Sequence, residues 1–303
     1  MRFGGHETFP IREGWLHKGT KLLVENPSRL VDKHVADWLG VGNNMAKSIK
    51  HWLVATGLAE LLDRKSFLKN PGLRISTFGE FIVKEDPYFT LDGTWWALHV
   101  NLVSNRESAA SWNWFFNYFN LNRFDKAVCL DSLRRYLQMS DIRMPTPKTL
   151  ERDVGCLLNS YSKKIPAENI DPEEALDCPF NELGLMTYFR NSGSYQLHQG
   201  QKLIPAHIFG YAISKAFFLT TGRGFTENTI TELTRLPGGP GRAFVLTSEA
   251  LYETAVRAER DLMGNIQISG LAGERVIRVK KMEPIRWMKE YYSSVKRKER
   301  HVA

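Results

Sequence analysis

A histidine and a glutamate stand side by side near the start of the chain, as His6 and Glu7 in the segment GGHETFPIREGWLHKG at residues 4–19. Hydrolysis of a phosphodiester needs a nucleophile with an acid or base partner, or carboxylate and histidine ligands for a metal ion. His6 and Glu7 are therefore the candidates for catalysis. The same segment contains Phe9 and Trp15, which favour an extended arm packed onto the first domain. The sequence leaves both interpretations open.

The rest of the sequence carries no recognisable catalytic signature. It has no Walker loop, no GxGxxG fingerprint after a strand, no HExxH or GxSxG motif, and no PD-(D/E)xK or HNH nuclease pattern. The glycine-rich PGGPGR at residues 237–242 lacks the GK[ST] of a phosphate loop and predicts a turn, in which Arg242 is a candidate phosphate contact. A metal-activated water would call for Mg²⁺ or Mn²⁺, but the pattern identifies no ligands for either ion.

The charge of the chain indicates an acidic partner, and its cysteine content indicates an intracellular location. The formal net charge is +8, and residues 272–301 contain ten Lys or Arg against four Asp or Glu. Such a balance favours attraction to phosphate backbones, with Lys296, Arg297 and Lys298 on an expected mobile basic tail. Three dispersed cysteines indicate reduced thiols. No apolar run is long enough to span a membrane, so we expect a cytoplasmic protein without membrane contacts.

A helix-turn-helix is predicted within residues 30–62. Its second helix begins at Asn43 or Asn44 and places apolar residues at i, i+4, i+7 and i+8 from Met45. The opposite, polar face would enter a major groove. Its candidate DNA-binding residues are Asn44, Lys47, Lys50 and His51. Two apolar runs around a basic turn then predict a wing with Lys65 and Lys69 near its tip.

The same pattern recurs in residues 124–164. Pro147 marks the start of a helix whose apolar residues again fall at i, i+4, i+7 and i+8, now from Leu150. This leaves Lys148, Thr149 and Arg152 towards solvent as a second set of DNA-binding candidates. The tryptophan-rich stretch before it favours a hydrophobic core over a base-stacking platform.

These patterns predict a mainly α fold with small β wings, built from tandem winged-helix or helix-turn-helix modules. The expected domains are an N-terminal arm and winged helix at 1–84, an aromatic-rich helical domain with the second helix-turn-helix at 85–165, and a C-terminal winged-helix-like domain with a basic tail at 166–303. In the last domain, Asn191-Ser192-Gly193 between two alternating runs predicts a hairpin.

Six stretches, in this order along nearly the whole chain, resemble an uncharacterised bacterial family encoded beside DNA phosphorothioation genes. They are GHETFPIREGWLHKG, LGVGNNMAKSIKHWLVATGL, WALHVNLVSN, WNWFFN, TLERDVGCLL and CPFNELGL. One branch of that family is the DNA-nicking subunit of a single-strand phosphorothioation defence system against phage. The resemblance implies partnership with a cysteine desulfurase, an ATPase and an ATP-pyrophosphatase-like sulfurtransferase. It assigns no catalytic residue in this sequence.

Three functions remain open at this point. The chain is expected to bind double-stranded DNA and nick one strand, which gives the sulfur-transfer enzymes access to the backbone. Alternatively, it is a non-catalytic DNA-binding adaptor or regulator that recruits those enzymes. The third class is a protein-interaction scaffold, which predicts no salt-dependent DNA affinity.

Overall fold

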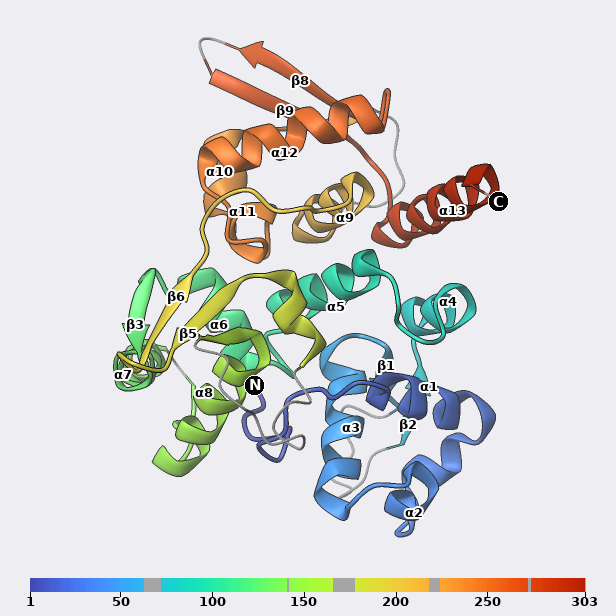
Figure 1. Ribbon diagram of the computed structural model, residues 1–303, viewed down its shortest axis with the longest axis vertical. Helices are drawn as coiled ribbons and strands as arrows, with labels where there is room; N and C mark the ends of the chain where they lie inside the picture. The colour runs from blue at the N-terminus through green and yellow to red at the C-terminus, as the bar shows by residue number, and fades with distance from the viewer. Residues whose placement is uncertain (63–71, 141, 166–177, 218–223, 272–273, 303) are drawn as a thin grey trace. The chain divides into compact units, whose positions relative to one another are not determined.

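Helices make up most of the computed structural model, and the expected fold class, mainly α with small β-sheets, is confirmed (Figure 1). The structure describes residues 1–62, 72–140, 142–165, 178–217, 224–271 and 274–302. The predicted wing residues Lys65 and Lys69 lie outside these ranges. The chain divides into two compact units, called unit 1 (Met1–Phe115 with Phe119–Leu197) and unit 2 (Phe116–Tyr118 with His198–Ala303).

The first half of unit 1 includes the segment in which a helix-turn-helix is predicted. Its elements are α1 (Trp15–Glu25), η1 (Pro27–Leu30), α2 (Val35–Leu39), α3 (Asn43–Ala55), β1 (Ala59–Leu61), β2 (Leu73–Ile75) and α4 (Thr77–Glu85). Gly40 ends α2 with a left-handed φ of 63°, the conformation that glycine adopts most easily. Strands β1 and β2 pair antiparallel. Most of the second apolar run forms α4 and not a wing strand, because the Ser76 side chain caps the helix by accepting from the Gly79 N–H.

The second half of unit 1 combines helices with one small sheet. Its elements are α5 (Asp92–Ser104), most of α6 (Ala110–Tyr118, of which Phe116–Tyr118 are grouped with unit 2), β3 (Arg123–Asp125), α7 (Lys126–Gln138), α8 (Pro147–Tyr161), β4 (Ser162–Ile165), η2 (Pro179–Leu183), β5 (Met186–Phe189) and β6 (Ser194–Leu197). The strand order is β3-β6-β5-β4, with β4 parallel to β5. The sheet is larger than the small wings that the sequence predicts.

The predicted hairpin at Asn191-Ser192-Gly193 is confirmed as β5–β6, with Gly193 at a φ of 62°. It belongs to unit 1 and not to the C-terminal part, because β6 also pairs antiparallel with β3. Apart from Phe116–Tyr118, the two compact units separate between Leu197 and His198. The tryptophan-rich helices are core elements, as expected: Trp96, Trp112 and Trp114 are all buried.

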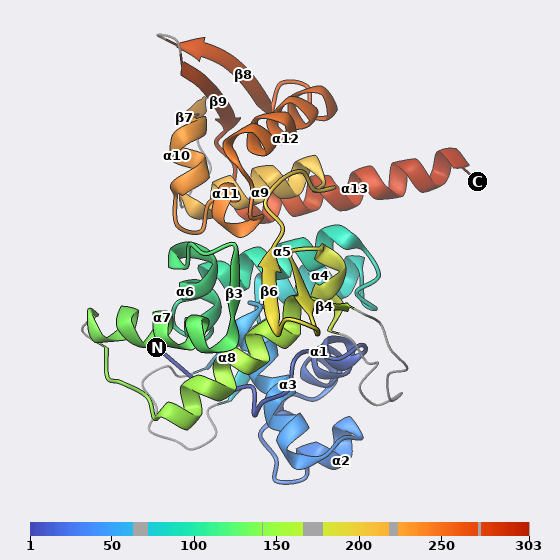
Figure 2. The ribbon, with the colours of Figure 1, turned by 60° about the vertical axis from the view of Figure 1, so that its left-hand side comes forward.

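Unit 2 consists of a helix, a strand, three helices, a hairpin and a final helix, in this order. Its elements are α9 (Ala206–Ala216), β7 (Phe225–Thr229), α10 (Ile230–Arg235), α11 (Pro240–Ala243), α12 (Ser248–Asp261), β8 (Ile266–Leu271), β9 (Glu274–Lys280) and α13 (Pro284–Val302) (Figure 2). The sheet order is β7-β9-β8. The glycine-rich segment includes the short helix α11. A Cβ on Gly241 would lie 2.4 Å from the Thr234 Cα, so the glycine permits this close backbone approach.

The C-terminal segment is a 19-residue helix, α13, and not the mobile tail expected from its charge. Its first half is anchored in the core of unit 2. Trp287 is fully buried and donates its indole N–H to the Ser214 hydroxyl at 2.7 Å. A Cβ on Gly210 would approach the Trp287 ring to 2.7 Å, so α9 and α13 pack at very close range.

In the described part of the chain, every helix is too short or too polar to cross a membrane.

Candidate nucleic-acid interface

An N-terminal arm, residues 1–14, runs between α3 and α8 in unit 1 (Figure 1). On the α8 side, the Gly4 N–H donates to Asp153 Oδ1 at 2.6 Å. On the α3 side, the Phe9 carbonyl accepts from Trp52 Nε1 at 3.0 Å and from Ser48 Oγ at 3.3 Å. The arm therefore links the two helices that the sequence predicts to read DNA.

His6 is the buried anchor of this arm. Its Nε2 lies 2.9 Å from Asp153 Oδ1, and its Nδ1 accepts from the Thr8 N–H at 3.0 Å. Ser111 Oγ donates to the other Asp153 oxygen at 2.8 Å. His6 and Asp153 are 1% and 2% exposed. Since Nδ1 accepts, Nε2 carries the proton, and the ring has no lone pair left for a general base. In this geometry His6 anchors the arm to α8.

Glu7 lies at the surface beside α3, with a carboxylate oxygen 3.9 Å from the Lys47 ammonium. Glu7 and Thr8 adopt left-handed φ values of 48° and 74°, although neither is glycine. Such residues cost on the order of 1–3 kcal/mol each and persist only where the surrounding contacts hold them. Here the anchor at His6 supplies those contacts. Glu7 therefore faces a predicted DNA-binding lysine and partly offsets its charge, and it is not paired with His6.

Apart from Asn159, the exposed residues of α3 and α8 lie in the N-terminal halves of the two helices. These N-terminal halves lie at the same edge of unit 1 (Figures 1 and 2). Asn44, Lys47, Lys148 and Arg152 are exposed, as predicted. The Asn44 Oδ1 accepts from the Lys47 ammonium at 3.2 Å. The positive ends of helix dipoles and nearby cations together make a favourable environment for phosphate. We call these four residues the α3/α8 surface.

Two other predicted residues are half-buried at this surface. Thr149 shares a hydrogen bond of 2.8 Å with Thr146 at the start of α8. Burial, with smaller contributions from Lys47 and Arg2, lowers the pKa of Lys50 below its usual value. Arg2 was not predicted from the sequence, because nothing in the local pattern shows that the arm brings it to α3.

His51 is buried and does not lie on an exposed reading face. Its side chain is covered by the arm: a Cβ on Gly5 would come within 2.5 Å of its Nδ1. Neither ring nitrogen has a hydrogen-bond partner among the residues that the structure describes. Burial, together with His6 and Arg2, holds the pKa of His51 well below the ordinary value. The expected solvent-facing position of this residue is thus incorrect, because the arm occupies the face opposite the core.

We expect the stability of unit 1 to decrease as the pH falls below about 6.5, the ordinary histidine pKa. The folded-state pKa of His51 is depressed, so below that pH the unfolded chain binds a proton that the folded chain excludes. The slope from one such group is at most about 1.4 kcal/mol per pH unit. Urea unfolding at pH 7.5 and 5.5 measures it, and His51→Leu should reduce the difference. An unchanged pH dependence in that variant would contradict the assignment.

The remaining predicted residues lie in unit 2. Arg242 is half-buried in α11, whereas Lys296, Arg297 and Lys298 are exposed on α13.

The sequence of nearly the whole chain, residues 3–292, matches the family described as a protein of unknown function, DUF4007. The chain belongs to the DUF4007 family. This confirms the resemblance to an uncharacterised family. Two solved structures of SspB are similar to this DUF4007 protein: each has a TM-score of 0.82 and 26% sequence identity, and the match covers 97% of this chain and 88% of the other. No curated protein sequence matches it.

One of the two SspB structures holds a magnesium ion. In this DUF4007 protein, the described residues include no group of three or more His, Cys, Asp or Glu that could hold a metal. The carboxylate of Asp153 already accepts from Gly4, His6 and Ser111. The residues of the arm therefore do not fit a magnesium site in this conformation.

Proposed function

We propose that this protein is the DNA-binding component of a bacterial DNA phosphorothioation system. In this proposal, unit 1 contains two winged-helix modules, one built on α1–α3 with β1–β2 and one on α6–α8 with β3, β5 and β6. The antiparallel pairing of β3 with the β5–β6 hairpin supports the second module. The α3/α8 surface would bind the phosphate backbone, and Asn44, Lys47, Lys50 and Arg152 would be the residues that meet base edges.

The observation that carries this proposal is the link between the two helices. The arm binds the Asp153 carboxylate of α8 through Gly4 and His6, and Ser48 and Trp52 of α3 through Phe9. Two basic helix ends held in one rigid unit form a single binding surface, so DNA binding does not have to order them first. The likeness to SspB supports the phosphorothioation context, in which a cysteine desulfurase, an ATPase and a sulfurtransferase would be the partners.

Strand nicking is a second candidate function, favoured by the likeness to SspB over nearly the whole chain. Opening one strand would expose a backbone position to the sulfur-transfer enzymes. The satisfied His6–Asp153 pair instead favours an adaptor that binds DNA and recruits those enzymes. A metal-dependent step has no support from the arm, because the Asp153 carboxylate already accepts from Gly4, His6 and Ser111.

We expect purified protein to bind duplex DNA with an affinity that falls steeply with salt, as measured by fluorescence anisotropy between 50 and 200 mM NaCl as a working range. Affinity that does not change with salt would contradict DNA binding and favour the interaction scaffold.

Plasmid relaxation then separates the two candidate functions. Supercoiled plasmid is incubated with the protein alone, with Mg²⁺ and with Mn²⁺. Plasmid that stays supercoiled while DNA binding is intact supports the adaptor. Conversion to the open circle by nuclease-free protein establishes nicking, and His6→Gln and Glu7→Gln then test which arm residue contributes.

A further inference from the structure

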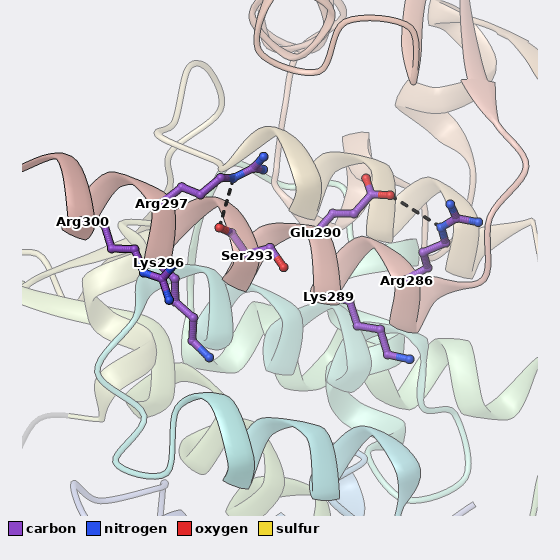
Figure 3. Close-up of a pocket in the computed structure, with 7 residues that line it drawn as sticks. All are labelled: Arg286, Lys289, Glu290, Ser293, Lys296, Arg297 and Arg300. Carbon is purple, nitrogen blue, oxygen red and sulfur yellow. Dashed lines mark hydrogen bonds and ion pairs between the residues drawn. The ribbon is translucent and has the colours of Figure 1, made fainter.

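The C-terminal helix α13 carries a basic stripe that lines an open hollow of about 520 Å³ (Figure 3). The lining residues are Arg286, Lys289, Glu290, Ser293, Lys296, Arg297 and Arg300. Relative to the first, they fall at i+3, i+4, i+7, i+10, i+11 and i+14, which is one continuous face of an α-helix. At a rise of 1.5 Å per residue, the stripe is roughly 21 Å long.

The stripe is strongly positive. It contains five cationic side chains and one carboxylate, Glu290. That carboxylate lies 3.6 Å from the Arg286 guanidinium and also accepts from the Asn265 amide at 3.2 Å. Arg297 donates to the Ser293 carbonyl at 3.3 Å, a bond that leaves its charge uncompensated. A surface of this length and charge complements a row of phosphates.

The stripe is held on a rigid element. On other faces of the same helix, Trp287, Met288 and Tyr292 are buried in unit 2, and the Trp287 indole is bonded to Ser214. The early part of the stripe is therefore ordered before any ligand binds, which lowers the entropic cost of binding.

The helix α12, by contrast, is poorly suited to contact DNA. It follows α10 and α11 and precedes the β8–β9 hairpin, which is the position of the reading helix in a winged-helix order. Its first half carries Glu249 and Glu253 and no cation. The Arg275 guanidinium of β9 lies 3.7 Å from Glu249 and 4.1 Å from the centre of the Tyr252 ring. The Arg275 side chain therefore contacts α12 itself.

We propose that unit 2 binds the phosphate backbone of duplex DNA through the α13 stripe and not through α12. The contact is independent of base sequence, because the stripe consists of point charges without a geometry for reading base edges. This inference rests on the proposed DNA-binding function and adds to it a second site, with Arg286, Lys289 and Arg300 as new contact residues.

The test uses the full chain and a double charge reversal, Lys289→Glu with Lys296→Glu. Its control is Arg235→Glu with Arg260→Glu, two exposed arginines of α10 and α12 that change the net charge of unit 2 by the same amount. Duplex affinity is measured by anisotropy over a series of salt concentrations, and circular dichroism melting verifies that both variants fold.

The stripe variant should bind about tenfold more weakly, and the slope of log affinity against log salt should fall by about 2, since each lost phosphate contact removes about 0.9. The control should keep the slope of the unmodified protein. Equal slopes in all three proteins would overturn the α13 site while leaving the α3/α8 surface in place. If the unmodified protein shows no salt-dependent affinity, the proposed function fails, and this inference fails with it.

Discussion

Replacing Asp153 by alanine is expected to lower the free energy of unfolding of unit 1 by about 3–5 kcal/mol, the usual cost of removing one partner from a buried charged network. The carboxylate accepts from the Gly4 N–H, from His6 Nε2 and from the Ser111 hydroxyl, and it is 2% exposed. Alanine leaves all three donors without their acceptor and detaches the arm from α8. An unpaired buried donor costs about 1–3 kcal/mol by itself.

Tryptophan fluorescence in a urea titration measures this effect in the relevant unit, since seven of the eight tryptophans belong to unit 1. Glu151→Ala is the matched control on the same helix, because its carboxylate is 61% exposed. It should change the stability by less than about 0.5 kcal/mol. Asp153→Asn keeps an acceptor oxygen and should fall between the two. An Asp153→Ala protein as stable as the control would show that the arm is not anchored at this carboxylate.

Reversing three charges of the α3/α8 surface at once, with Lys47→Glu, Lys148→Glu and Arg152→Glu, should weaken duplex binding about 100-fold at moderate salt. Each phosphate contact contributes about one unit to the slope of log affinity against log salt concentration. Each contact to a base edge contributes about 1–3 kcal/mol to the free energy of binding. The three side chains are exposed and lie on two helices joined by one arm. The losses of binding free energy from the three substitutions should therefore add up, because all three side chains would contact DNA in the same complex.

The control for this variant is a triple reversal at Lys18, Lys21 and Lys84. These lysines are exposed on α1 and α4 and give the same change in net charge. Anisotropy titrations with duplexes of different base sequence show whether any sequence preference is lost along with backbone binding. If both triple variants bind equally well, the α3/α8 surface is not the interface. If both lose affinity equally, net charge alone explains the binding.

Local periodicity predicted the helices and the side of each that enters the core. The spacing i, i+4, i+7, i+8 from Met45 and from Leu150 identified α3 and α8, and Ile49, Trp52, Val154 and Leu157 are buried as it requires. Turn chemistry predicted the β5–β6 hairpin in the same way. These features depend on residues that are neighbours in sequence, so a window of the chain contains all the information that they need.

The charge of the C-terminus was a less reliable guide to its structure. A tail interpretation follows from many lysines and arginines, yet α13 is a regular helix anchored by Trp287. The heptad-like spacing of Arg286, Lys289 and Lys296 was present in the sequence and indicates one helical face. A count of charged residues that ignores their helical spacing does not reveal this face.

By itself, the sequence determined the family, the mainly helical fold class, the two core-facing helices and the excess of positive charge. It also placed His6 and Glu7 in one conspicuous segment, but it did not distinguish an arm from an active site. Only the tertiary structure shows how the arm is anchored, because the partner of His6 lies 147 residues away at Asp153. A contact between residues so far apart in the sequence produces no periodic pattern in it. The same long-range packing covers His51 and brings the N-terminal ends of α3 and α8 to one edge of unit 1.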